Sequence, residues 1–220
     1  MQPRLDILPP QQRDLWPALA FVPRRFVLYR GTAIALRLGH RESVDFDFFA
    51  SEALDLDGLL AAWPELATAP VIRQQPDAFA AFVPRRGLPV RVSFFGGLGN
   101  GRVGAPEATE DGVLHLASPL DLLGHKLKVI LQRAEGKDYQ DIAALLAAGL
   151  SLAEGLGAAR ALFPGFPVME AARALAYRGD IAEPGRVDAA AAARLDAALA
   201  DLPAAIPVVP LLAAGIAPAA

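Results

Sequence analysis

The sequence predicts an α+β protein in which a lobe of strands and helices is followed by a lobe of helices alone. Short alternating segments that are typical of strands occur only before about residue 115. Beyond that point the texture is helical throughout. We therefore expect an α+β lobe over residues 1–115, a helical lobe over 116–202, and a tail rich in proline and alanine over 203–220.

The amino-acid composition indicates a globular protein and excludes sites that need cysteine. The chain has 220 residues, of which 54% are hydrophobic and 20% charged, as in a globular protein. It has no cysteine, which excludes disulfides and thiolate metal sites, and its N-terminus lacks the apolar core of a signal peptide. We therefore expect a cytoplasmic protein. The apolar tail is interrupted by four prolines, so we expect a packed or disordered tail, or else a partner-binding segment, and no membrane association.

Net charge is −3, which argues against a surface that is basic throughout. Between residues 15 and 41, however, there are five arginines and no acid. A basic rim of this kind would suit a nucleotide or an RNA end, although ordinary solvated arginines explain it equally well.

The elements of the first lobe follow from local patterns. We expect helices over 6–20, 33–38 and 55–63, strands over 26–29, 44–49, 71–74, 78–83 and 88–95, and a loop over 96–112. In the second lobe, Ser118 and Pro119 are typical of a helix start. We expect helices there over 118–132, 137–148, 151–162, 167–178 and 186–200.

The strand over 44–49 carries two carboxylates. Side chains alternate along a strand, so Asp45 and Asp47 project from the same face and would repel one another. A hard divalent cation such as Mg²⁺ or Mn²⁺ takes oxygen ligands and removes that repulsion. Just before them, Gly31 and Thr32 end one strand and open a helix, where backbone amides can bind phosphate. This segment predicts a site for a metal and a triphosphate.

Residues 26–49 resemble the opening motif of the nucleotidyltransferase AbiEii/AbiGii toxin family, within the DNA polymerase β-like superfamily. The matching residues are Gly31-Thr32, Gly39-His40-Arg41 and the string from Ser43 to Phe49. The chain departs from the motif at Arg30, where the family usually has a glycine. The resemblance covers most of residues 20–180 and implies a polymerase β-like lobe with a mixed sheet.

Two later residues gain a role from the resemblance. Lys126 lies on a largely apolar helix stripe, from which lysine commonly reaches to solvent, but relatives have a similar lysine that approaches the nucleotide phosphates. Asp138 opens the next helix, where an acid also suits the helix dipole, and the family places a matching aspartate in its active site. The same reading extends to Asp141 more weakly.

The expected site residues are therefore of three kinds. Asp45 and Asp47 hold the metal, Lys126 and Asp138 are catalytic, and the groups that bind the nucleotide or its phosphates are Gly31, Thr32, Arg41 and Ser43. Arg41 suits a phosphate because its guanidinium can pair in a bidentate manner. Many polymerase β-like enzymes have a third carboxylate on a later strand. Here the outward positions of residues 88–95 offer no acid, only Arg91, Ser93 and Phe95.

The resemblance implies an enzyme that transfers a nucleoside monophosphate from a nucleoside triphosphate to a hydroxyl. The acceptor would be a tRNA 3′ end or a protein, and a cognate antitoxin protein would be a partner. Arg30 and the missing third acid motivate an alternative, a catalytically degenerate module of the same fold that binds nucleotides or proteins. A glycosyltransferase that uses the Asp-x-Asp motif is disfavoured, because only 44 residues precede Asp45.

Overall fold

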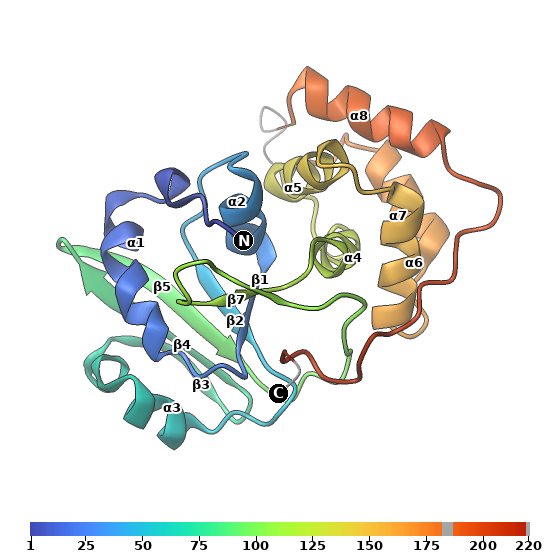
Figure 1. Cartoon of the computed structure of the whole chain (residues 1–220). Helices are drawn as coiled ribbons and strands as arrows, with labels where there is room; N and C mark the ends of the chain where they lie inside the picture. The colour runs from blue at the N-terminus through green and yellow to red at the C-terminus, as the bar shows by residue number, and fades with distance from the viewer. Residues whose placement is uncertain (182–186, 219–220) are drawn as a thin grey trace.

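A mixed sheet of seven strands forms the centre of the first lobe. The computed structural model describes residues 1–181 and 187–218. The strand order is β3-β4-β5-β2-β1-β7-β6 (Figure 1). The strands are β1 Val27–Tyr29, β2 Phe46–Phe49, β3 Val71–Gln75, β4 Ala78–Arg85, β5 Leu88–Phe95, β6 Glu107–Ala108 and β7 His115–Leu116. Pairing is parallel between β2 and β5 and between β1 and β7, and antiparallel elsewhere.

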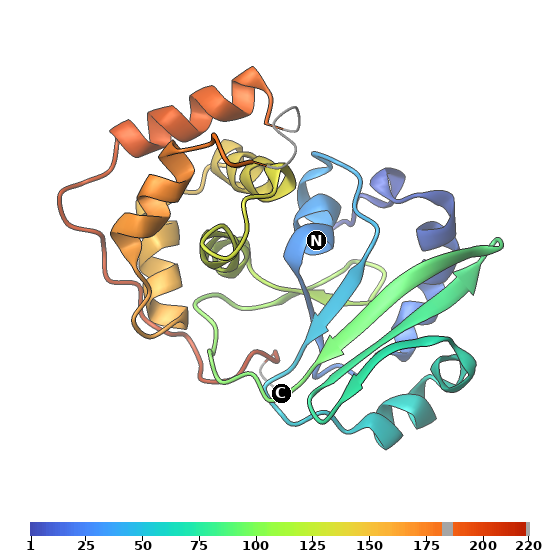
Figure 2. The same ribbon diagram turned by 180° about the vertical axis from the view of Figure 1, so that it is seen from behind.

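The helices divide into two groups. Figure 1 shows α1 and α3 beside the sheet, and Figure 2 shows from behind that α4 to α8 gather on the other side of the molecule. Their bounds are α1 Pro10–Leu15, α2 Arg30–Leu38, α3 Leu56–Ala62, α4 Pro119–Val129, α5 Gly136–Ala147, α6 Leu152–Leu162, α7 Val168–Ala176 and α8 Ala189–Ala200. Three short 3-10 helices cover Leu5–Ile7, Trp16–Phe21 and Pro64–Thr68. The prediction of an α+β fold with a mixed sheet and C-terminal helices is confirmed.

Three predicted elements differ from the structure. The helix expected over 6–20 is instead α1 followed by a 3-10 helix, because Pro17 has no amide hydrogen with which to extend an α-helix. The loop expected over 96–112 contains β6, whose two residues are too few to show a strand pattern. The expected helix over 186–200 begins at Ala189 in the structure, where the Asp188 carboxylate accepts a hydrogen bond from the Ala191 amide, and residue 186 lies outside the described residues.

The two faces of the sheet differ in character. Phe46, Phe48 and Phe94 point into the core and are fully buried. The opposite face carries the row that crosses β1, β2 and β5, in which Asp47 pairs with Tyr29 on one side and with Ser93 on the other. Register therefore places Asp47 on the face away from this core, and that face meets the helical lobe at β1, where Tyr29 lies against His125. The strand expected over 44–49 begins only at Phe46, so Asp45 precedes it.

The tail runs back across both lobes. Arg160 of α6 donates to the carbonyls of Ile206 and Pro207, and Arg102 donates to those of Gly215 and Ala217. The Ile216 side chain is 0% exposed, and its amide donates to Ser51 Oγ at 2.8 Å. Figure 1 shows this segment passing α6 on its way to the sheet. The described part of the tail is therefore anchored at Ile216, while most of its other side chains are at least partly exposed, and residues 219 and 220 lie outside the described residues.

Within the described ranges no single helix is long and apolar enough to cross a membrane. The pair α5 and α6 reaches the required length and composition only together, and it is bent by 118°.

Replacing Ile216 tests how much the tail contributes to stability. We expect Ile216→Ala to lower the free energy of unfolding by about 2–5 kcal/mol, because it leaves a cavity where a buried isoleucine was. Val208→Ala, at a tail residue that is 84% exposed, should change it by less than about 0.5 kcal/mol. Urea denaturation measures both variants. Equal values for the two would show that the tail is not anchored at Ile216.

Candidate active site

The acidic pair lies at the start of β2. Asp47 has a side chain only 10% exposed, and Asp45, one residue before the strand, is partly buried. Arg30 Nη1 donates to Asp47 Oδ1 at 3.2 Å. Burial raises the pKa of Asp47 above its usual value, the positive charge of Arg30 opposes this, and the negative charge of Asp45 adds to it. One guanidinium therefore leaves the pair incompletely neutralised, which is the condition that a bound cation relieves.

Ser93 lies next to Asp47 on the neighbouring strand β5, at one of the positions where a third acid would be expected. It is fully buried, and its Oγ has no hydrogen-bond partner among the described residues. Within those residues no cluster of three or more histidine, cysteine or acidic side chains could hold a metal alone. Mg²⁺ keeps several waters and is commonly held by one or two carboxylates together with substrate phosphates. Asp45 and Asp47, with an unpaired oxygen beside them, fit that kind of site.

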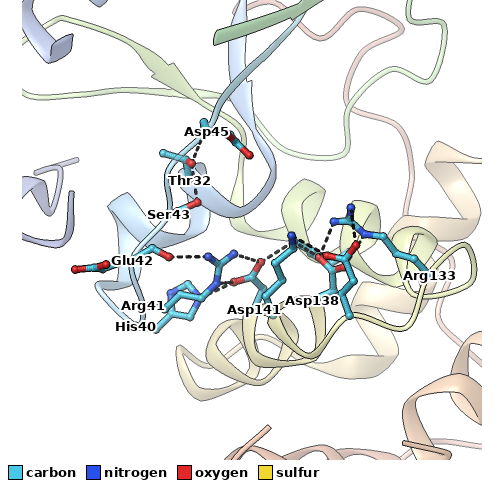
Figure 3. A network of polar contacts seen from close by, with 12 residues as sticks. Thr32, His40, Arg41, Glu42, Ser43, Asp45, Arg133, Asp138 and Asp141 are labelled. Carbon is cyan, nitrogen blue, oxygen red and sulfur yellow. Dashed lines mark hydrogen bonds and ion pairs between the residues drawn. The ribbon is translucent and has the colours of Figure 1, made fainter. Parts of the chain in front are cut away.

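The first turn of α2 holds Asp45 in place. The Thr32 and Ser43 hydroxyls are 2.8 Å apart, and Thr32 also donates to the Asp45 carbonyl (Figure 3). Both side chains are buried. In this structure the two hydroxyls fix the segment that leads into β2. A role of Thr32 and Ser43 in binding phosphate remains a prediction, because their hydroxyls contact each other and Thr32 also donates to the Asp45 carbonyl.

Arg41 is engaged inside the protein. Its Nε and Nη2 donate to Asp141 at 2.7 and 2.8 Å, and His40 Nε2 lies 2.7 Å from the same carboxylate. A side chain at Gly31 would collide with the Arg41 guanidinium, so glycine there makes room for this pair. The predicted contact of Arg41 with phosphate is likewise untested, and the structure gives Arg41 another partner.

Lys126 completes a buried network. Its Nζ lies 2.6 Å from Asp138 Oδ1 and 2.6 Å from Asp141 Oδ2, and the side chain is almost fully buried. Arg133 Nε donates to Asp138 Oδ2 at 2.9 Å. Figure 3 shows the resulting chain of contacts from Arg41 to Arg133. Residues that the sequence suggested one by one are thus brought into a single cluster, although their predicted catalytic roles remain predictions.

The positive and negative side chains of this cluster do not balance. Burial by itself raises the pKa of Asp141, but the charge of Lys126 and the hydrogen bonds from His40 and Arg41 outweigh it and hold that pKa well below its usual range. Followed through its ion pairs, the cluster has one more cation than carboxylate: Arg41, Lys126, Arg133 and Lys137 against Glu135, Asp138 and Asp141. The excess is suited to a phosphate.

Arg133 is the member of the cluster that reaches solvent. Its side chain is 46% exposed. Burial alone would lower its pKa, but Asp138, Glu135 and the charge of Asp47 together raise it. The influence of Asp47 means that Arg133 and the acidic pair are near enough to interact. The sequence patterns did not single out Arg133. It lies seven residues after Lys126, and this helical spacing was the available signal.

An aromatic wall stands beside the acidic pair. The rings of Tyr29 and Phe49 stack with centroids 5.0 Å apart, and His125 of α4 lies 4.8 Å from Tyr29. The Arg30 guanidinium carbon lies 5.3 Å from the centroid of Phe49 and 5.0 Å from that of Phe95. Burial lowers the pKa of His125 to about 3, so its ring is neutral at pH 7. Arg30 therefore lies over rings as well as against a carboxylate.

Replacing Asp141 tests the network. Asp141→Asn leaves Arg41 and Lys126 without their common counter-charge, so we expect it to cost about 3–5 kcal/mol of unfolding free energy at pH 7. Asp196→Asn removes an exposed partner of Arg178 and should cost under about 1 kcal/mol.

The difference between wild type and Asp141→Asn should depend on pH. Because folding lowers the pKa of Asp141, its contribution is complete above the unfolded pKa of about 3.9 and is lost as pH falls further. Denaturant titrations from pH 7 down to 2.5 measure this. A difference that stays constant or grows toward low pH would contradict the assignment.

Comparison with known proteins gives relatives for this architecture. Over residues 13–207 the sequence matches the family described as nucleotidyl transferase AbiEii toxin, type IV TA system. No curated protein sequence matches it significantly.

Two solved structures have a similar fold. A candidate nucleotidyltransferase from H. pylori aligns with a TM-score of 0.59 and 17% identity, over 85% of this chain and 91% of its own. An antigenic nucleotidyltransferase-like protein from Paracoccidioides brasiliensis aligns with a TM-score of 0.50 and 17% identity, over 80% and 84%. At such identity these likenesses concern the fold. The family match covers nearly the whole chain, and the chain therefore belongs to the AbiEii nucleotidyltransferase toxin family of type IV toxin–antitoxin systems.

Proposed function

We propose that this chain transfers a nucleoside monophosphate from a nucleoside triphosphate to a hydroxyl group, with Mg²⁺ or Mn²⁺ held by Asp45 and Asp47. The observation that carries the proposal is the pairing of these incompletely neutralised carboxylates with a nearby cluster that has excess positive charge. Such an arrangement suits a triphosphate, whose oxygens can contact a cation on one side and basic side chains on the other.

Each side chain has a task in this proposal. When bound, the metal ion lowers the negative charge that an attacking oxygen meets at the α-phosphorus. Arg133 contacts the phosphates from the exposed end of the cluster, and Lys126 contributes positive charge to the pyrophosphate as it leaves. Asp138 holds these two cations with its two oxygens and acts as a positioning residue. The amides of Gly31 and Thr32 bind a phosphate at the start of α2.

The acceptor and the partner are further parts of the proposal. An acceptor hydroxyl attacks the α-phosphorus, its oxygen forms the new bond, and the bond to the pyrophosphate breaks. The hydroxyl proton passes to a phosphate oxygen of the substrate and leaves with the pyrophosphate. The acceptor is a tRNA 3′ end or a protein hydroxyl. Membership of a toxin–antitoxin family supports a nucleotide substrate and a cognate antitoxin that restrains the activity.

Two features favour a second candidate, a degenerate module that binds nucleotides without transferring them. Arg30 contacts Asp47, and Ser93 stands where a third acid would lie. An incorporation assay separates the two candidates. The protein is incubated with Mg²⁺ and each nucleoside triphosphate in turn, labelled at the α-phosphate, with total tRNA or without any added acceptor.

We expect label to appear on tRNA or on the protein, and Asp47→Asn to reduce the rate on the order of 100-fold or more, because it removes charge from the reacting centre. The control is Asp57→Asn, an exposed acid of α3, which should leave the rate unchanged. Nucleotide binding that depends on Mg²⁺ but gives no transfer would establish the degenerate module. No binding to any nucleotide would refute both candidates.

A further inference from the structure

Arg30 has a backbone conformation that is unusual for its residue type. Its φ is 61°, in the left-handed region that favours glycine. Among the described residues only one other residue with a side chain, Arg86, has a positive φ. The chain therefore accepts a strained backbone to place a long cation at the first residue of α2.

The Arg30 side chain lies over the acidic pair. Its guanidinium donates to Asp47 Oδ1 and lies across the rings of Phe49 and Phe95. Within the described residues, Asp47 forms its ion pair with Arg30. A divalent cation bound to this carboxylate would lie beside the guanidinium that already contacts its Oδ1. The guanidinium and the metal are both positive, so they cannot both lie against Asp47 without strong repulsion.

We propose that Arg30 is an internal cation that competes with the catalytic metal for Asp47. In the free protein it neutralises the carboxylate, and metal binds only when the guanidinium moves away. This inference rests on the proposed function, because it assumes that Asp45 and Asp47 hold the metal. It adds a determinant of metal affinity that belongs to this chain.

The contact is weak enough to be reversible. It is a single hydrogen bond of 3.2 Å, near the long end of the normal range, and the Arg30 side chain is 47% exposed. A buried ion pair with two hydrogen bonds, such as that of Arg41 with Asp141, would not dissociate so readily. The free protein thus exists as a blocked form in equilibrium with an open form. The measured dissociation constant of the metal is the intrinsic one divided by the open fraction.

Mn²⁺ binding without nucleotide tests the proposal, by titrating the full chain and following free Mn²⁺ by electron paramagnetic resonance. Arg30→Gly removes the cation and suits the local φ, so the fold is kept. We expect it to bind Mn²⁺ about fivefold more tightly than wild type, the change that corresponds to loss of a partly exposed ion pair. Arg86→Gly is the matched control, since it removes the same charge and the same strain from the β4–β5 turn. It should change affinity less than twofold.

Asp47→Asn separates this inference from the function on which it rests. If Asp47→Asn weakens Mn²⁺ binding, Arg30→Gly alone tightens it, and Arg30→Gly brings no gain in the Asp47→Asn background, both stand. If Asp47→Asn weakens binding but Arg30→Gly alone leaves it unchanged or weaker, the competition is refuted and the metal site remains. An equal gain from Arg86→Gly also refutes it, because the effect would then be one of net charge. If Asp47→Asn has no effect on Mn²⁺ binding, or no variant binds, both are refuted.

Discussion

The buried carboxylate of Asp141 is the constraint on which the arrangement of the two lobes depends. A charge removed from water must be compensated by close cations or donors, and those available come from different parts of the chain. His40 and Arg41 follow α2, whereas Lys126 belongs to α4. Their convergence on α5 fixes the first turn of α2 against the helical lobe. The hydrogen bond between the Thr32 and Ser43 hydroxyls, and that from Thr32 to the Asp45 carbonyl, then hold Asp45 in place relative to α2.

Much of the fold could be predicted because its signals are local. Alternation identified β2 and β5, and Ser118 with Pro119 marked the start of α4, where the serine hydroxyl accepts from the Asp121 amide. Elements without a local pattern were missed. The strand β6 has two residues, and it exists because β7 lies alongside it. Nothing in the sequence of residues 203–218 indicates that Ile216 enters the core, since that depends on a contact with Ser51 far away in the chain.

The candidate site was predictable to the same extent. The strand pattern predicted the face of Asp47, which the register shows between Tyr29 and Ser93, whereas a common face with Asp45 stays a prediction because Asp45 precedes β2. The ion-pair partners of the basic side chains could not be predicted from the sequence, because residue spacing does not show which acidic side chain an arginine contacts in the fold. Arg41 reaches a carboxylate 100 residues along the chain. Likewise the position of the Arg30 side chain depends on a backbone angle that arginine seldom adopts.

The anchored tail has a consequence for how freely the two lobes can move. The lobes are joined at two separate places: the Asp141 network near α2, and the tail, which contacts Arg160 at Ile206 and Ser51 at Ile216. Because these contacts lie at different places, the lobes cannot rotate apart as rigid units unless the contacts at one of the two places are broken. The relative position of the lobes is therefore set twice over, and loss of one set of contacts would leave the other in place.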